Sequence, residues 1–245
     1  MENSKKHIIG GITGGVGQAL AKNLLAEGHT VAGFSRGGES EDLEGVSIHS
    51  CDATDPAALE STLMALYEEL GQVDCYTHAI GSIFLKPAHL TSPEDWHQTI
   101  RQNLDSAFFA LRVIGKLMMK QGNGSCLFFS TAAAQTGIAN HESIAAAKGG
   151  LEAMVRAAAA SYSSRGIRFN AIAPSLTDTP LSKDILGSEQ ALEISKKMHP
   201  LGAITEAGDV ASLAAWLHSD AAKFATGQTF VLDGGISTVV PKPKA

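Results

Sequence analysis

The sequence of 245 residues lacks the features that mark several protein classes. Its three cysteines, Cys51, Cys75 and Cys126, are odd in number and have no C-x-x-C spacing, which predicts free buried thiols in a reducing compartment. No hydrophobic run approaches the ~18 residues of a membrane span. The opening MENSKK leads into an expected strand rather than into the core of a signal peptide. We therefore expect a cytoplasmic protein with no membrane contact.

Positive charge is also scarce. There are 19 Lys and Arg against 25 Asp and Glu, the net charge is -6, and no basic block is present. This pattern argues against nucleic acid as a partner. No His, Cys and Asp cluster has metal-ligand spacing, so we expect no metal. Hydrophobic residues make up 44% of the chain, which is enough for one sizeable core.

Short hydrophobic runs alternate with longer amphipathic segments along the chain. This alternation predicts an α/β fold with one doubly wound parallel sheet of about seven strands and helices on both faces. We expect one domain over residues 1–238, a loose tail over 239–245, and an irregular segment over 175–203 that covers a ligand. Strands are expected at 7–12, 30–35, 46–52, 73–80, 125–130, 167–174 and 229–233, and helices at 16–27, 55–70, 92–120, 142–163 and 206–218.

A glycine-rich turn, GGITGGVG at 10–17, follows the first expected strand and opens the first helix. Glycines at such a turn permit close approach of the backbone to a pyrophosphate, and the helix N-terminus supplies free N–H groups. A tight strand–helix turn without a ligand is the structural alternative. The dinucleotide interpretation assigns cofactor contacts to Gly11, Thr13, Gly14, Gly15, Val16 and Gly17.

The second expected strand ends in Ser35 and Arg36, where an NAD site usually has an acid. A guanidinium suits the 2′-phosphate of NADP(H), so we favour NADP(H) over NAD(H). An exposed surface arginine is the alternative. Asp52 and Ala53 follow the third strand, where Asp52 either receives the adenine amino group or is a simple loop acid.

The chain resembles the short-chain dehydrogenases/reductases over almost its whole length. The residues that carry the resemblance are the glycine turn, CDATD at 51–55, VDCYTHAIG at 73–81, Asn103, Lys148, RFNAIAPSLTDTPL at 168–181 and GQTFVLDGG at 227–235. The resemblance implies a Rossmann fold, a nicotinamide cofactor, a small-molecule substrate and a homotetramer. It also implies cofactor contacts at His78, Ala79, Ile80, Gly81, Lys148, Pro174, Leu176 and Thr179.

Several residues depart from the pattern of this family. Gly10 replaces the usual threonine of the glycine turn, Thr131 stands at the catalytic serine and Ile144 stands at the catalytic tyrosine. Asn103, which holds a relay water in the family, and Lys148, which binds the nicotinamide ribose, both match. The proton relay that the resemblance implies therefore lacks its acid.

The segment NHESIAAAKGGLEAM at 140–154 is similar to the enoyl-acyl carrier protein reductases, which place their tyrosine seven residues before the lysine. Here that residue is His141. A neutral imidazole N–H can stabilise an enolate oxygen, and we expect the charge of Lys148 to keep the ring neutral. A solvated histidine at a helix start is the alternative for His141, and a structural histidine is the alternative for His78. Thr131 either orients the substrate or packs, and Ser143 is expected to be structural.

Two functions of different classes remain open. One is an NADP(H)-dependent oxidoreductase that transfers hydride to an activated C=C (enoyl-thioester-like) or C=O substrate, with Asn103, Thr131, His141 and Lys148 at the catalytic site. Residues 82–90 and 175–203 are then expected to form the apolar substrate side. The other is a catalytically silent dinucleotide-binding protein, a sensor or subunit, because Ile144 replaces the tyrosine. Isomerisation or dehydration on the same scaffold is a third, smaller possibility.

Overall fold

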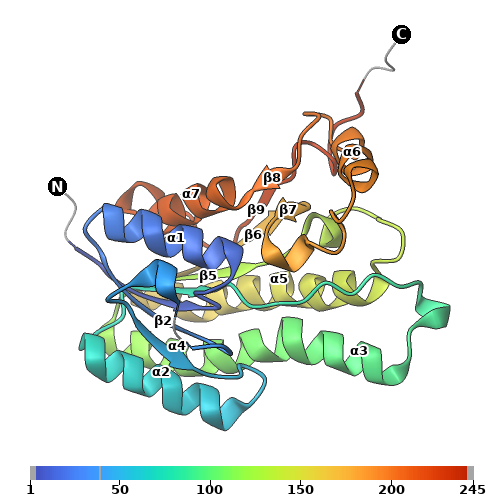
Figure 1. Ribbon diagram of the computed structural model, residues 1–245. Coiled ribbons are helices and arrows are strands. Elements are labelled where there is room, and N and C mark those ends of the chain that lie inside the picture. Colours follow the sequence, from blue (N-terminus) through green and yellow to red (C-terminus); the bar gives the residue numbers. More distant parts are fainter. Residues whose placement is uncertain (1–3, 39, 242–245) are drawn as a thin grey trace.

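The computed structural model describes residues 4–38 and 40–241. Within them, parallel strands form one sheet in the order β3-β2-β1-β4-β5-β6-β9, so the prediction of a doubly wound parallel sheet in a single α/β domain is confirmed (Figure 1). The expected boundary of a tail at 239 stays a prediction, and residues 242–245 lie outside the described part. The strands of this sheet are β1 (Lys6–Gly10), β2 (Thr30–Ser35), β3 (Ser47–Ser50), β4 (Cys75–His78), β5 (Gly124–Phe129), β6 (Ile167–Pro174) and β9 (Thr229–Leu232).

Helices cover both faces of the sheet and bury a hydrophobic cluster on each (Figure 1). On one face, α1 (Gly15–Ala26) and α7 (Ala207–His218) pack against the sheet. On the other face lie α2 (Pro56–Leu70), α4 (Ser106–Gln121) and α5 (Glu142–Tyr162). No helix in the described residues is long and apolar enough to cross a membrane.

Local capping signals explain where two of the predicted helices begin. Asp55 accepts hydrogen bonds from the backbone N–H groups of Ala57 and Ala58, and Pro56 occupies the first helical position, where it loses no hydrogen bond. Ser92 caps α3 (Pro93–Ile100) in the same way, through the N–H of Asp95. These side chains satisfy N–H groups that a helix start otherwise leaves without partners.

The helix expected over 92–120 is interrupted. Between α3 and α4 the backbone makes a π-helical turn, Arg101–Asp105, with Asn103 buried at its centre. Such turns insert an extra residue into a helix and occur frequently at functional sites. The turn redirects Asn103 toward the loop that follows β4.

The segment 175–203 is not the irregular loop that the sequence predicts. It contains β7 (Thr177–Asp178), which pairs with β8 (Thr205–Glu206), and the helix α6 (Glu189–Met198). Ser188 caps α6 by accepting from the N–H of Ala191. In Figure 1 this helix projects from the body of the molecule, beyond the carboxyl end of β6.

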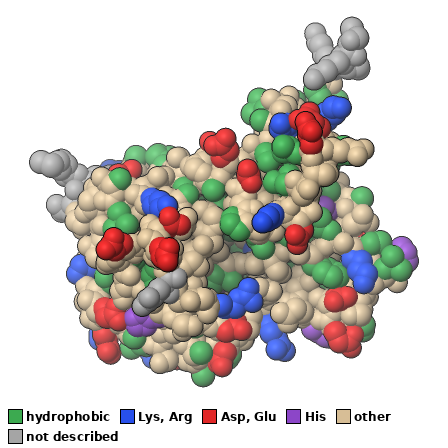
Figure 2. All heavy atoms as spheres, in the orientation of Figure 1, with side chains coloured by type: hydrophobic (Ala, Val, Ile, Leu, Met, Phe, Trp, Pro, Cys, Tyr) green, Lys and Arg blue, Asp and Glu red, His purple; other side chains and the backbone are tan. Residues whose placement is uncertain are grey.

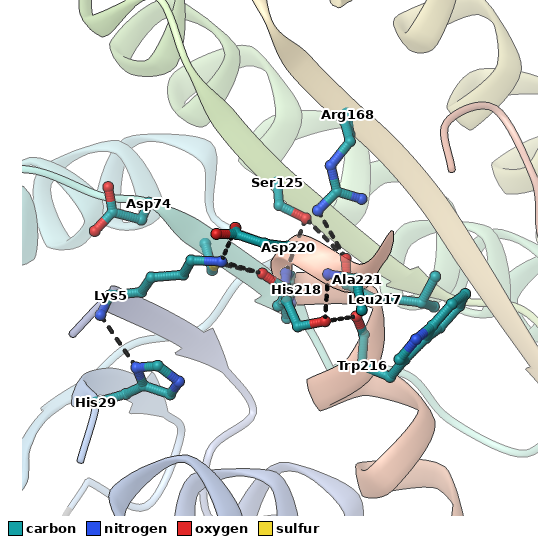
Figure 3. A network of polar contacts seen from close by, with 12 residues as sticks. Lys5, His29, Asp74, Ser125, Arg168, Trp216, Leu217, His218, Asp220 and Ala221 are labelled. Carbon is teal, nitrogen blue, oxygen red and sulfur yellow. Dashed lines mark hydrogen bonds and ion pairs between the residues drawn. The ribbon is translucent and has the colours of Figure 1, made fainter. Parts of the chain in front are cut away.

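A polar network joins the first and last parts of the chain at the opposite edge of the sheet (Figure 3). The carbonyls at the C-terminus of α7 have no partners within the helix. Lys5 Nζ donates to His218 O at 3.0 Å and to Asp220 Oδ1 at 2.6 Å, and Arg168 Nη2 donates to Leu217 O at 2.8 Å. These cations also suit the negative end of the helix dipole.

Buried histidines lie beside this network. The ring of His218 makes hydrogen bonds with Thr77 Oγ1 at 2.8 Å and Ser125 Oγ at 3.0 Å. His7 lies 5.5 Å from it between ring centroids, and both His7 ring nitrogens are buried without a partner in the described chain. Burial lowers the pKa of His7 to about 3, with smaller contributions from His29 and Lys5.

Candidate functional site

A cavity of about 530 Å³ opens at the carboxyl ends of β4, β5 and β6. Open α/β sheets bind ligands at this edge. Most of the wall is hydrophobic, and Figure 2 shows further hydrophobic side chains over the lobe that carries α6. The apolar part of the wall comes mainly from Ile83, Leu85, Ile138, Ile144, Leu176, Leu181, Ile185, Met198 and Ile236.

Lys148 and Asn103 meet at one side of this cavity. A Cβ placed on Gly81 would lie 2.8 Å from Asn103 Oδ1 and 3.3 Å from Lys148 Nζ, so only glycine leaves room for both groups. Lys148 Nζ donates to Phe129 O at 2.7 Å. Burial lowers the pKa of Lys148 to about 8. The amine is therefore a cation at neutral pH that loses its proton more readily than an exposed lysine.

The side chain of Asn103 is fully engaged as a donor. Its amide nitrogen donates to Ser82 Oγ at 2.9 Å and to Thr99 O at 3.0 Å, and its Oδ1 accepts from Ser82 N at 3.0 Å. Asn103 therefore fixes the loop after β4 against the π-helical turn. It shapes the cavity beside Lys148 and leaves no amide proton for a substrate.

Thr131 lines the cavity at the end of β5 with a hydroxyl that can still donate. Its Oγ1 accepts from Ala133 N at 3.3 Å, and no acceptor for its own proton lies within the described residues. A hydroxyl in this state can donate to an oxygen of a bound molecule.

The turn that carries Thr131 is held by a buried carboxylate. Glu152, on α5, accepts from Ser130 Oγ at 2.5 Å and from the side-chain amide of Gln135. Ser130 precedes Thr131 and Gln135 follows the next short turn, so one side chain anchors both ends of the segment. Glu152 could not be predicted from the sequence, because its partners lie in a different element.

His141 and Ile144 both line the cavity at the start of α5. The Nδ1 of His141 lies 2.8 Å from Ala139 O, and a carbonyl can only accept, so Nδ1 carries a proton. In a neutral ring Nε2 then has a lone pair. This tautomer corrects the expected role, because His141 can donate to a substrate through Nε2 only as the imidazolium. Ile144, 5% exposed, adds apolar surface where the family has its tyrosine.

The glycine turn lies next to this cavity and has the geometry expected for a dinucleotide. Gly11 has φ +77°, and a Cβ there or on Gly17 would collide with a backbone carbonyl. A Cβ on Gly15 would come 2.8 Å from the side chain of Thr179, which lines the cavity with Val16. Thr13 and Gly14 complete the turn before α1. The first N–H groups of α1 remain available to an anion at this point.

The residues expected around an adenine ribose lie at the ends of β2 and β3, outside the cavity. Arg36 is exposed, and Ser35 is buried with its hydroxyl donating to Gly38 O at 3.1 Å. Hydrogen bonds from Thr54 lower the pKa of Asp52, and the charge of Arg36 adds a smaller effect. Ala53 is buried beside Asp52. Arg36 is therefore the side chain of this group that is free to reach a phosphate.

His78 does not reach the cavity. Its Nδ1 lies 2.9 Å from Tyr76 Oη and its Nε2 lies 3.1 Å from Ser106 Oγ, all within the core. Burial lowers the pKa of His78 to about 3, with a smaller effect of Lys148. His78 is therefore a structural histidine, as the alternative interpretation stated. Its hydrogen-bond partners are side chains rather than backbone groups. The residues that follow it, Ala79, Ile80 and Gly81, line the cavity, as do Pro174, Leu176 and Thr179.

Two residues of the segment 175–203 form a polar pair on the cavity wall, where the sequence predicts an apolar surface. Ser175 follows β6, and His199 follows α6 and is 5% exposed. They lie 24 residues apart in the chain, with α6 in the segment between them, and meet in the folded chain. Among the described residues, no cluster of His, Cys, Asp and Glu is arranged to hold a metal ion.

A family model described as Enoyl-(Acyl carrier protein) reductase matches residues 11–237. The chain belongs to the short-chain dehydrogenase/reductase family. This short-chain dehydrogenase/reductase is 29% identical over 238 residues to the 3-oxoacyl-acyl-carrier-protein reductase FabG of Salmonella typhimurium, covering 95% of this chain and 97% of FabG.

Other similar proteins span the same length. The D-threitol dehydrogenase of Mycolicibacterium smegmatis is 27% identical over 242 residues, which cover 95% of this chain and 93% of that protein. Among solved structures, the ligand-free aldohexose dehydrogenase of Thermoplasma acidophilum has a TM-score of 0.90 at 25% identity, covering 99% of this chain and 98% of the other. The whole fold of this short-chain dehydrogenase/reductase is therefore that of an oxidoreductase family.

Proposed function

We propose that the protein is an NADP(H)-dependent reductase that transfers hydride to an activated C=C or C=O bond of a substrate with an apolar body. The observation that carries the proposal is the cavity itself, where Lys148 and the Thr131 hydroxyl face a hydrophobic wall beside the glycine turn. The exposed Arg36 supports the preference for NADP(H), because its guanidinium can pair with a 2′-phosphate. We also propose a homotetramer, as the family resemblance implies.

The chain's own residues account for the polar part of the reaction. The cofactor, when bound, supplies the hydride. Negative charge then develops on the carbonyl or thioester oxygen of the substrate, and the Thr131 hydroxyl donates a hydrogen bond to it. Such a donor typically lowers a barrier by ~3–4 kcal/mol. The Lys148 cation adds electrostatic stabilisation from within a low-dielectric wall.

The final proton has two candidate sources. The imidazolium of His141 can deliver it through Nε2. With an enoyl thioester, the enolate can instead take a proton from water after hydride transfer. Ile144 leaves no side-chain acid at its own position.

The proposal is tested by NADPH oxidation with crotonyl and longer enoyl thioesters and with small and 3-oxo ketones. FabG is named as a 3-oxoacyl reductase and the matching family description names an enoyl reductase, so both classes belong in the screen. We expect turnover that Thr131→Val lowers about 100-fold, that His141→Gln lowers, and that the exposed-site control His97→Gln on α3 leaves unchanged. NADPH binding without turnover of any of these substrates would reject the reductase.

The second candidate, a silent dinucleotide-binding protein, is favoured by the apolar wall at Ile144. It predicts tight NADPH binding and no turnover in the wild type. It also predicts that Ile144→Tyr, which restores the family's acid beside Lys148, produces carbonyl reduction. A wild-type rate above that of the variant would reject it.

A further inference from the structure

Ser175 and His199 form a hydrogen-bonded pair on the wall of the cavity. Ser175 Oγ lies 2.9 Å from His199 Nε2, and His199 Nδ1 lies 2.7 Å from the carbonyl oxygen of Ser195. The imidazole is buried, while Ser175 is only partly buried. The hydride-transfer proposal makes no use of this pair.

The carbonyl of Ser195 fixes the tautomer of His199. A carbonyl oxygen only accepts, so the ring proton is on Nδ1 and Nε2 presents its lone pair to the Ser175 hydroxyl. Thr205 Oγ1 lies 3.2 Å from Ser175 Oγ and can donate to one of its two lone pairs, which leaves the other free. A hydroxyl that donates to an oriented imidazole is the arrangement of an activated serine nucleophile.

The backbone next to Ser175 supplies a second feature of a serine nucleophile site, a free N–H group. The N–H of Leu176 has no acceptor within the described chain, and Leu176 also lines the cavity. In α/β-hydrolases the N–H of the residue after the nucleophile binds the oxyanion of the tetrahedral intermediate. The hydrophobic wall around the pair suits the hydrocarbon part of an acyl group.

We propose that Ser175 is a nucleophile and His199 its general base, and that the protein transfers or hydrolyses apolar acyl groups from esters or thioesters. Ser175 Oγ attacks the acyl carbon, and its proton passes to His199 Nε2. The bond from the acyl carbon to the leaving oxygen or sulfur breaks, and that atom takes the proton from Nε2. Water, activated by His199 in the same way, then releases the carboxylic acid from the acyl-Ser175 intermediate.

This activity needs no oxidant or reductant, and its test is therefore independent of hydride transfer. The full-length protein is treated with an alkyl fluorophosphonate, and the modified residue is located by peptide mass spectrometry. Hydrolysis of p-nitrophenyl hexanoate is followed in parallel. We expect phosphonylation of Ser175 and ester hydrolysis in the wild type. Ser175→Ala should abolish both, and His199→Gln should slow both about 100-fold or more.

Matched variants distinguish the loss of a catalytic group from the loss of the folded structure. Ser212→Ala changes an exposed serine of α7, and His97→Gln changes an exposed histidine of α3, so neither should alter the rates. Thermal melting of every variant identifies loss of fold, and His199→Asn is the replacement if His199→Gln does not fold. Absence of labelling in the folded wild type, labelling of another serine, or an undiminished rate in folded His199 variants would each overturn the proposal.

Discussion

Gly10 at the end of β1 lies against the ring of Phe34 on β2: a Cβ at position 10 would come 2.6 Å from the Phe34 Cζ atom. The family's usual threonine at this position therefore does not fit this core. We expect Gly10→Thr to lower the free energy of unfolding by ~1–3 kcal/mol, the usual cost of overpacking. Urea unfolding measures the effect, and Gly37→Thr, at a position with no neighbour within 4 Å, is the control.

The same relationship predicts a rescue. If the ring of Phe34 causes the loss, the double variant Gly10→Thr with Phe34→Val should be more stable than the sum of the two single changes predicts. Additive losses in the double-mutant cycle would show that the ring is not the cause.

Arg36 should determine the choice between the two cofactors. Replacing it with aspartate removes the positive charge and repels a 2′-phosphate. We expect Arg36→Asp to weaken NADPH binding about 10- to 100-fold and to leave NADH binding within a small factor. Fluorescence titration with each cofactor measures this, with the exposed Lys223→Asp as a charge-matched control. Equal losses for NADPH and NADH would contradict the assignment.

Glu152 should control the order of the turn that presents Thr131. Glu152→Ala leaves the hydroxyl of Ser130 without its acceptor and opens a hole beside it. We expect a loss of ~1–3 kcal/mol in the free energy of unfolding and faster amide hydrogen exchange over residues 130–135. Glu152→Gln, which can still accept, should recover part of both, and the exposed Glu142→Ala should change neither. Unchanged exchange in Glu152→Ala would mean that the turn is held by other contacts.

The buried histidines should make the fold sensitive to acid. The pKa of His7 is lowered to about 3 by burial, so the native ring stays neutral while the unfolded ring, with a pKa near 6.5, takes up a proton. The unfolded state thus binds more protons between these values, and stability falls as pH falls through that window. At pH 5 this amounts to ~2 kcal/mol for each such histidine.

Replacement of His7 isolates its share. Its ring nitrogens have no partner in the described chain, so His7→Phe removes the protonation penalty without breaking a hydrogen bond there. We expect a smaller difference between the free energies of unfolding at pH 7.5 and pH 5 for this variant than for the wild type. An equal pH dependence in both would place the acid sensitivity elsewhere, for instance at His218.

The features of the fold that depend on residues close together in the sequence could be predicted. The caps Asp55 and Ser92, the glycine turn and the alternating strands and helices led to the observed sheet, because each depends on neighbours in the chain. The helix α6 was missed, since its polar sequence fits an exposed loop equally well. The π-helical turn was missed because it depends on Asn103 reaching Ser82, in a loop that precedes it by 21 residues.

The residues of the candidate site also divide into those that could be predicted from the sequence and those that could not. Lys148, Thr131 and Gly81 were placed by their position in motifs, and they do meet in the cavity. The direction of a histidine ring was not predictable, because the proton on His141 is set by the carbonyl of Ala139 and the ring of His78 is turned into the core by Tyr76 and Ser106. Ser175 lies in the motif at 168–181 and His199 lies in no motif, and only the folded chain brings them together.

The ion pair between Lys5 and Asp220 joins residues 215 positions apart. On a ribosome, β1 is therefore made long before the end of α7 that its flanking lysine binds. Its two neighbours in the sheet, β2 and β4, are complete by residue 78, whereas the partners of Lys5 lie at His218 and Asp220. Non-local pairings of this kind slow folding. The nascent chain thus leaves Lys5 without these partners until α7 is complete, and a product truncated before residue 217 would lack the carbonyls that Lys5 and Arg168 bind.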